Sequence, residues 1–130
     1  MEINNLPKTI PVFPLSNFII FPKTTVPLNI FEPRYIEMIN DAMSGNRIIG
    51  MIQPKNNTSG KPSLYNIGCA GKITSFNETD DGRYIISLTG ISRYKITEEI
   101  KTEKLYRKCN VNFNVFSNDL VKKKYRHKIF

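Results

Sequence analysis

Prolines interrupt the first third of this chain at close intervals, and they constrain the fold more than any other feature. Between Ile10 and Met43 they punctuate short apolar runs, at Pro11, Pro14, Pro22, Pro27 and Pro33. Because proline cannot donate a hydrogen bond to a central ladder, it occurs at strand starts, sheet edges and bulges. This spacing predicts short, bent strands at a sheet edge rather than the regular strands of a sandwich.

Apolar runs and alternating apolar residues predict about eight short strands. We expect them at residues 10–13, 18–20, 25–30, 47–53, 67–76, 83–88, 91–97 and 106–116. The polar segment 54–62 should be a loop, and Asp80-Asp81-Gly82 should form a hairpin turn. Gly90 is expected to separate one strand from the next.

One amphipathic helix is expected to begin at Pro33, which fits the first helical position, and to end near Gly45 in a left-handed cap. Its apolar face should pack Ile36, Ile39 and Met43 against the strand residues Val12, Ile49, Ile86 and Leu88. A basic helix is expected over 118–130, with Ser117 as its cap. Together these elements predict a mainly β (α+β) pseudobarrel of short mixed strands, closed by one helix.

The 130 residues predict one domain, with a β part at 1–116 and a basic helix or remnant of a longer helical segment at 117–130. Of the net charge of +8, residues 101–130 hold +7 and residues 1–100 hold +1. A prediction of nucleic-acid binding from the net charge would therefore depend on one terminal segment. Its cations are either a solvated helix face or a weak polyanion contact: Lys122, Lys123, Lys124, Arg126 and Lys128.

The side chains that support catalysis or metal binding are scarce. His127 is the only histidine, and Cys69 and Cys109 are too few for a zinc site or a disulfide framework. A GxxxxGK[ST] phosphate loop is missing from the sequence. We therefore expect no enzyme activity, no metal and no cofactor. Without a long apolar run or a leader, we also expect no membrane contact and a cytoplasmic location.

Four elements in this order resemble the opening of the Lon N-terminal domain family, the substrate-recognition module of Lon protease, which also occurs as a stand-alone protein. They are Phe13-Pro14-Leu15, Phe21-Pro22, Val26-Pro27-Leu28 and Ile30-Phe31-Glu32-Pro33-Arg34-Tyr35. The likeness continues through Asn66–Ala70, Asp81–Tyr84, Leu88–Tyr94 and Tyr106-Arg107, so it spans about residues 10–120. It implies a PUA-like barrel. Family members usually carry a longer helical segment, so this chain would be a stand-alone or truncated member, without the ATPase and peptidase domains of Lon.

The resemblance implies non-catalytic recognition of exposed apolar segments of unfolded proteins, through a groove or by β-augmentation at an open edge. The expected partner surface is Phe21, Pro22, Phe31, Arg34, Tyr35 and Arg93. Within it, Phe31 and Tyr35 could instead anchor the helix on the barrel. The apolar run Phe18–Phe21 favours a strand buried on both faces, and its alternative is an exposed apolar ledge.

Two other classes of function stay open. An RNA- or nucleotide-binding PUA-like module is suggested by the implied fold and the basic tail. However, the sequence lacks the interleaved aromatic and basic residues that single-stranded nucleic acids require. A scaffold that only self-associates is the third possibility.

Overall fold

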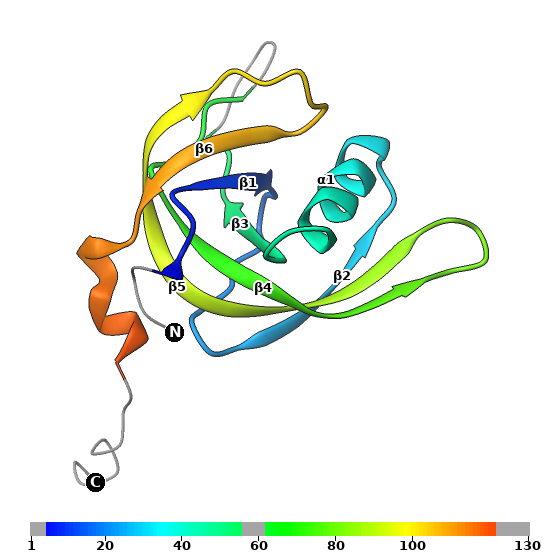
Figure 1. Cartoon of the computed structure of the whole chain (residues 1–130), viewed down its shortest axis with the longest axis horizontal. Coiled ribbons are helices and arrows are strands. Elements are labelled where there is room, and N and C mark those ends of the chain that lie inside the picture. The colour runs from blue at the N-terminus through cyan, green and yellow to red at the C-terminus, as the bar shows by residue number, and fades with distance from the viewer. Residues whose placement is uncertain (1–4, 56–61, 122–130) are drawn as a thin grey trace, which may run out of the picture.

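A computed structural model describes residues 5–55 and 62–121 as one mixed six-stranded sheet curled into a near-closed ring (Figure 1). The strands are β1 (Thr9–Pro14), β2 (Thr25–Ile30), β3 (Ile48–Ile52), β4 (Ile67–Glu78), β5 (Tyr84–Ile100) and β6 (Arg107–Asn112). Helix α1 (Pro33–Met43) and the 3-10 helix η2 (Asn114–Leu120) complete it. The predicted mainly β class with one closing α-helix is confirmed.

The long strand β5 joins the two ends of the sheet. The strand order is β2-β5-β4-β3-β1-β6, and β5 also pairs with β6. The first part of β5, Tyr84–Thr89, pairs with β2, and its last part, Lys95–Ile100, pairs with β6. Only β1 and β3 run parallel. Register shifts in the β4–β5 and β5–β6 pairs bend the strands enough to curl the sheet.

Two apolar clusters fill the molecule. The cluster under α1 contains Ile39, Ile49, Ile86 and Leu88, as predicted, and Ile36 and Met43 pack at its margin. The prediction for Val12 is wrong, because Val12 belongs to the second cluster, with Ile10, Tyr94, Cys109 and Phe113. The reason is strand alternation: Phe13, the next residue of β1, faces α1, so Val12 must face the other way.

Helix α1 begins at Pro33 as predicted but does not end in a left-handed glycine. Gly45 has no positive φ, and Arg47 takes the left-handed conformation instead, with φ of 65°. The N–H groups of Gly45 and Arg47 both donate to the carbonyl oxygen of Ala42, at 3.0 and 2.9 Å. The chain therefore reverses at Arg47, one residue before β3. At the β4–β5 turn, Gly82 has φ of 84°, which fits the predicted hairpin.

Two strand predictions are wrong. Residues 18–20 form no strand, and Gly90 lies inside β5 instead of dividing it, so there are six strands rather than eight. The position of Gly90 has a clear cause. The loop that contains Phe21 crosses β5 at Gly90, where a Cβ atom would lie 2.1 Å from the Phe21 carbonyl oxygen. Gly90 therefore accommodates a crossing backbone and does not end a strand.

The predicted C-terminal helix also differs from the structure. Helical structure begins at Asn114, so Ser117 lies inside η2 and is not its cap. The rest of that prediction, residues 122–130, lies outside the described residues.

Candidate functional site

An apolar pocket of about 540 Å³ opens between the loop that follows β1, the end of β3 and the start of β4. Its walls include Phe18–Phe21 from the loop, Met51 and Ile52 from β3, and Ile67 and Cys69 from β4. Pockets of this size that are mainly apolar and have a few polar groups are typical of ligand-binding sites.

The rim of this pocket exposes an unusual share of large apolar side chains. Ile19, Phe21, Tyr65 and Ile67 are 62, 63, 52 and 53% exposed, and all four line the pocket. They are four of the nine large hydrophobic residues exposed in the described parts of the chain. The run Phe18–Phe21 therefore forms the exposed ledge, and the favoured prediction of a doubly buried strand is wrong. Within the run, only Ile20 is buried in the core.

The loop that carries Phe21 is fastened to the sheet. The Thr24 hydroxyl donates to the Phe21 carbonyl oxygen at 2.7 Å and accepts from the Phe21 N–H at 3.2 Å. The Lys23 N–H donates to the Gly90 carbonyl oxygen, and the Gly90 N–H donates to that of Thr24, both at 2.8 Å. Phe21 is therefore held outward by a hydrogen-bonded turn.

The floor of the pocket is unreactive. Burial, reinforced by the negative charge of Asp119, raises the pKa of the Cys69 thiol to about 12. A protonated thiol is neither a nucleophile nor a good metal ligand near neutral pH. Behind the floor, the Tyr94 hydroxyl donates to the Met51 carbonyl oxygen at 2.9 Å and fixes the end of β3. The pocket can thus bind apolar groups but has no evident means of covalent chemistry.

Arg93 of β5 contributes the only charged side chain among the described residues that line the pocket. Its Nε and Nη2 atoms donate to the Asp119 carboxylate at 3.1 and 2.9 Å, and its backbone N–H donates there at 2.9 Å. Its guanidinium also lies 4.6 Å from the ring centroid of Phe116 in η2. These contacts hold η2 beside the pocket and fix the position of the Arg93 head group.

The structure separates the six residues of the predicted partner surface. Phe21 and Arg93 line the pocket, and Pro22 follows Phe21 in the same turn. Arg34 and Tyr35 line a different pocket of about 300 Å³, beside Tyr106 and Arg107. Tyr35 is 6% exposed, so it anchors the helix, whereas Phe31 is 65% exposed and does not.

Sequence reasoning missed Tyr65 and Ile67 as rim residues. Ile67 begins a predicted strand, and Tyr65 follows a polar loop, so neither position suggests a binding surface. Their positions depend on the pairing of β3 with β4, which the Tyr65 N–H extends by donating to the Gln53 carbonyl oxygen at 3.1 Å.

Other kinds of site find little support in the described part of the chain. Residues 5–55 and 62–121 contain no group of three or more His, Cys, Asp or Glu that could hold a metal ion. None of the helices described is long and apolar enough to cross a membrane. The basic residues Lys122, Lys123, Lys124, Arg126 and Lys128 lie outside the described residues.

A family model described as the ATP-dependent protease La (LON) substrate-binding domain matches residues 9–126. The chain belongs to this family. Its match covers both the apolar pocket and the Arg93–Asp119 contact, so the pocket lies within the substrate-binding domain. The match leaves only residues 1–8 and 127–130 of this sequence outside the domain.

Full-length Lon proteases are among the relatives. The chain is 36% identical over 104 residues to a Lon protease of Desulfosudis oleivorans, and the aligned region covers 77% of this chain and 13% of that protein. It is 33% identical over 107 residues to a Lon protease of Flavobacterium johnsoniae, and the aligned region covers 78% of this chain and 13% of that protein. The chain thus spans only about 13% of the length of these curated relatives.

Two solved structures share the fold. The Lon N-terminal domain protein from Xanthomonas campestris matches with a TM-score of 0.65 and 23% identity, over 81% of this chain and 59% of that one. The N-terminal domain of Mycobacterium avium complex Lon protease matches with a TM-score of 0.65 and 16% identity, over 82% of this chain and 54% of that one. At these identities the likeness concerns the fold alone.

Proposed function

We propose that this domain binds exposed apolar segments of unfolded or partly folded polypeptides in the pocket beneath the Phe21 ledge. The observation that carries the proposal is the clustering of Ile19, Phe21, Tyr65 and Ile67, all more than half exposed, around one apolar pocket. Exposed apolar groups concentrated at one place typically mark an interaction site. The family's description as a substrate-binding domain supports the same class of ligand.

A groove explains the binding better than β-augmentation does. One free edge of the ring is β2, which pairs only with β5 among the described strands. Pro27 lies in the middle of β2 and cannot donate to an added strand. A groove of about 540 Å³ has room for a few apolar side chains, and binding there does not require an unpaired strand edge.

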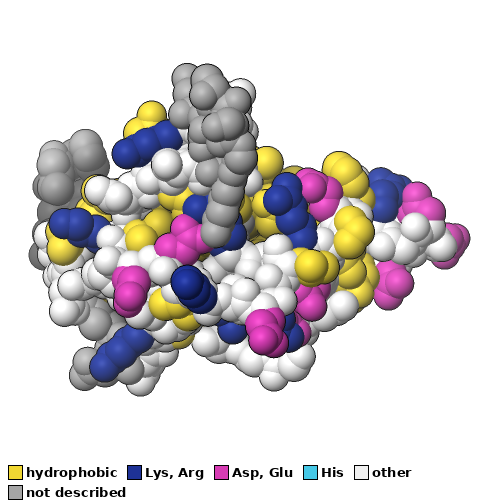
Figure 2. Space-filling model, turned by 90° about the horizontal axis from the view of Figure 1, so that it is seen from above, with side chains coloured by type: hydrophobic (Ala, Val, Ile, Leu, Met, Phe, Trp, Pro, Cys, Tyr) yellow, Lys and Arg dark blue, Asp and Glu magenta, His cyan; other side chains and the backbone are white. Residues whose placement is uncertain are grey.

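The RNA-binding alternative has less support. On the face seen in Figure 2, basic and acidic side chains are interspersed, with no continuous basic stripe. The aromatic residues at the pocket, Phe18, Phe21 and Tyr65, are accompanied there by one cation, Arg93, which Asp119 pairs. Single-stranded nucleic acids need a basic groove along the stacked bases.

The test compares two exposed phenylalanines. Phe21→Ser should weaken capture of a reduced and alkylated, permanently unfolded protein, because it removes one wall of the pocket. The matched control is Phe31→Ser, since Phe31 is equally exposed but does not line this pocket. Affinity is measured by fluorescence anisotropy, and the same protein with its disulfides intact should not bind.

Both variants should keep the thermal midpoint of the parent, because exposed substitutions usually change stability by about 0.5 kcal/mol or less. Equal loss of binding in both variants, or none in Phe21→Ser, would contradict the proposal. Tight RNA binding by a chain that lacks residues 122–130 would favour the nucleic-acid alternative instead.

A further inference from the structure

The charges around the pocket restrict which apolar segments fit, and this inference rests on the proposed function. Among the described residues, no Asp or Glu lines the pocket, whereas Arg93 does. Lys55 Nζ lies 5.6 Å from the ring centroid of Tyr65, but Lys55 itself does not line the pocket. The pocket therefore presents apolar walls and one charged hydrogen-bond donor, Arg93, at its margin.

Arg93 keeps hydrogen-bonding capacity for a ligand. Its Nε and Nη2 atoms are used by Asp119, while Nη1 donates to no acceptor within residues 5–55 and 62–121. The side chain remains 51% exposed, and that of Asp119 only 10%. A guanidinium can bind more than one acceptor through its five N–H groups. An incoming carboxylate would thus meet a charged donor whose position is already fixed, which lowers the entropic cost of binding.

We propose that the pocket selects apolar segments that carry a carboxylate next to the inserted side chains, with the carboxylate accepting from Arg93 Nη1. The apolar side chains lie against the Phe21 ledge, and the carboxylate forms a charge-assisted hydrogen bond at its margin. A lysine or arginine at the same place would meet the Arg93 guanidinium instead of an acceptor, which adds to the selectivity.

The carboxylate has two possible sources in a polypeptide, an Asp or Glu side chain and the C-terminal carboxylate. Both offer the same two oxygen acceptors to a guanidinium. The peptide series therefore includes peptides with a carboxylate side chain and a separate peptide with a free C-terminal carboxylate.

The test uses fluorescein-labelled peptides with one apolar core, Phe-Leu-Ile-Phe, flanked by two Glu, two Gln or two Lys and amidated at the C-terminus. A fourth peptide ends in a free carboxylate directly after the core. Fluorescence anisotropy at low salt gives Kd. The Glu-flanked peptide should bind roughly fivefold more tightly than the Gln-flanked one, the factor that an exposed ion pair of about 1 kcal/mol gives, and the Lys-flanked peptide more weakly than both. Tighter binding of the free-carboxylate peptide than of the amidated Gln peptide would add the C-terminus as a source.

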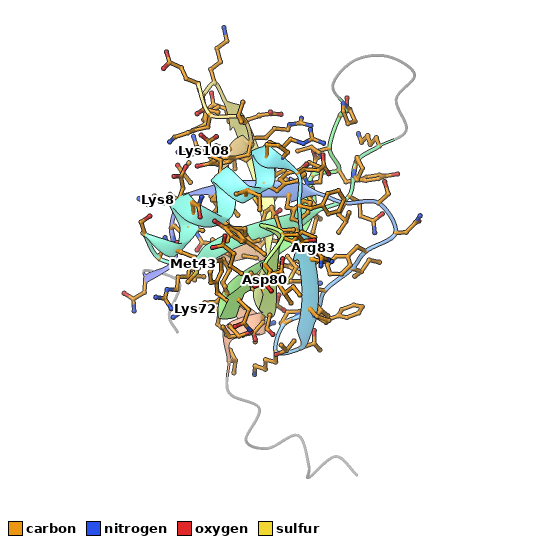
Figure 3. All side chains as sticks on the ribbon, turned by 90° about the vertical axis from the view of Figure 1, so that its right-hand side faces the viewer. Lys8, Met43, Lys72, Asp80, Arg83 and Lys108 are labelled. Atoms are coloured by element: carbon orange, nitrogen blue, oxygen red, sulfur yellow. The ribbon has the colours of Figure 1, made fainter. Side chains whose placement is uncertain are left out.

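The key variant is Arg93→Gln combined with Asp119→Asn, which removes both charges of this ion pair. It should bind the Glu- and Gln-flanked peptides equally. Arg83→Gln is the control, because it also removes one cation, from an ion pair with Asp81 at the tip of the β4–β5 hairpin (Figure 3). That tip projects away from η2 (Figure 1), so this variant should keep the preference.

The outcomes separate this inference from the proposed function. Equal binding of the Glu, Gln and Lys peptides by the parent chain would overturn the inference while apolar recognition stands. A preference for Glu that persists in the double variant would also overturn it, because Arg93 would not be the donor. Binding of none of the peptides would overturn the proposed function and this inference together. Circular dichroism of each variant confirms that it is folded.

Discussion

Tyr35 packs its ring against that of Phe13, with a centroid distance of 4.2 Å and an interplanar angle of 29°. The Arg34 guanidinium lies over the same Tyr35 ring, with its carbon 4.7 Å from the ring centroid. Two neighbours in the Ile30–Tyr35 motif thus differ in kind: Tyr35 is part of the core under α1, and Phe31 is exposed. A residue can therefore match the family motif because it builds the fold.

This difference predicts unequal effects on stability. Tyr35→Ala should lower the free energy of unfolding by about 3 kcal/mol or more, as truncation of a buried aromatic residue does. Phe31→Ala, the matched control, should change it by about 0.5 kcal/mol or less. Urea denaturation followed by circular dichroism measures both. If Tyr35→Ala kept the stability of the parent, Tyr35 could not be an anchor of α1.

At the scale of elements, the loop from Leu15 to Thr24 and the strand β5 depend on each other. The loop has no strand of its own in the sheet, and its position is set by the two backbone hydrogen bonds that Gly90 makes with Lys23 and Thr24. The close approach of the Phe21 carbonyl to Gly90 leaves no room for a side chain. The ledge is therefore positioned by a residue that does not line the pocket.

Gly90→Ala tests this dependence. The added Cβ would lie 2.1 Å from the Phe21 carbonyl oxygen, so the loop must move. We expect a loss of stability of about 1–3 kcal/mol, typical of overpacking, together with weaker peptide binding. Gly45→Ala is the control, because its Cβ would meet only ordinary contacts at 3.6 Å or more and its φ is not positive. Equal peptide affinity in the two folded variants would show that the ledge does not depend on Gly90.

At the scale of the whole molecule, several buried groups are held in their protonated forms. Burial raises the pKa of the Cys69 thiol to about 12 and that of the Tyr94 hydroxyl well above its usual value. The pKa of Tyr106 is also raised, by burial and by the hydrogen bond that its hydroxyl donates to Asp41 at 2.7 Å. Cys69 and Tyr94 lie on the paired strands β4 and β5, Tyr106 belongs to the cluster under α1, and all three groups act on stability in the same direction.

The sign of this effect predicts sensitivity to alkali. A thiol that titrates near pH 9 in the unfolded chain and near pH 12 in the fold stabilises the native state fully below pH 9 and progressively less as the pH rises toward 12. The two tyrosines extend the same trend. The free energy of unfolding, measured with urea from pH 8 to 11, should therefore fall, and Cys69→Ala should fall less steeply. A constant value over this range would contradict the raised pKa values.

The sequence alone determined the family, the mainly β class and the start of α1. These features depend on local signals: proline positions, alternation of apolar residues, and a helical face that includes Ile39. Short-range signals persist in the fold because they reflect backbone sterics and side-chain periodicity.

Which apolar residues form the pocket rim depends on tertiary contacts. Phe21 and Ile67 look like strand residues in the sequence, and their exposure depends on a loop crossing at Gly90 and on the pairing of β3 with β4. The partner of Arg93 lies 26 residues away, in η2. Contacts of this kind join segments distant along the chain, so no local pattern encodes them, and the proposed binding surface can be recognised only in the folded chain.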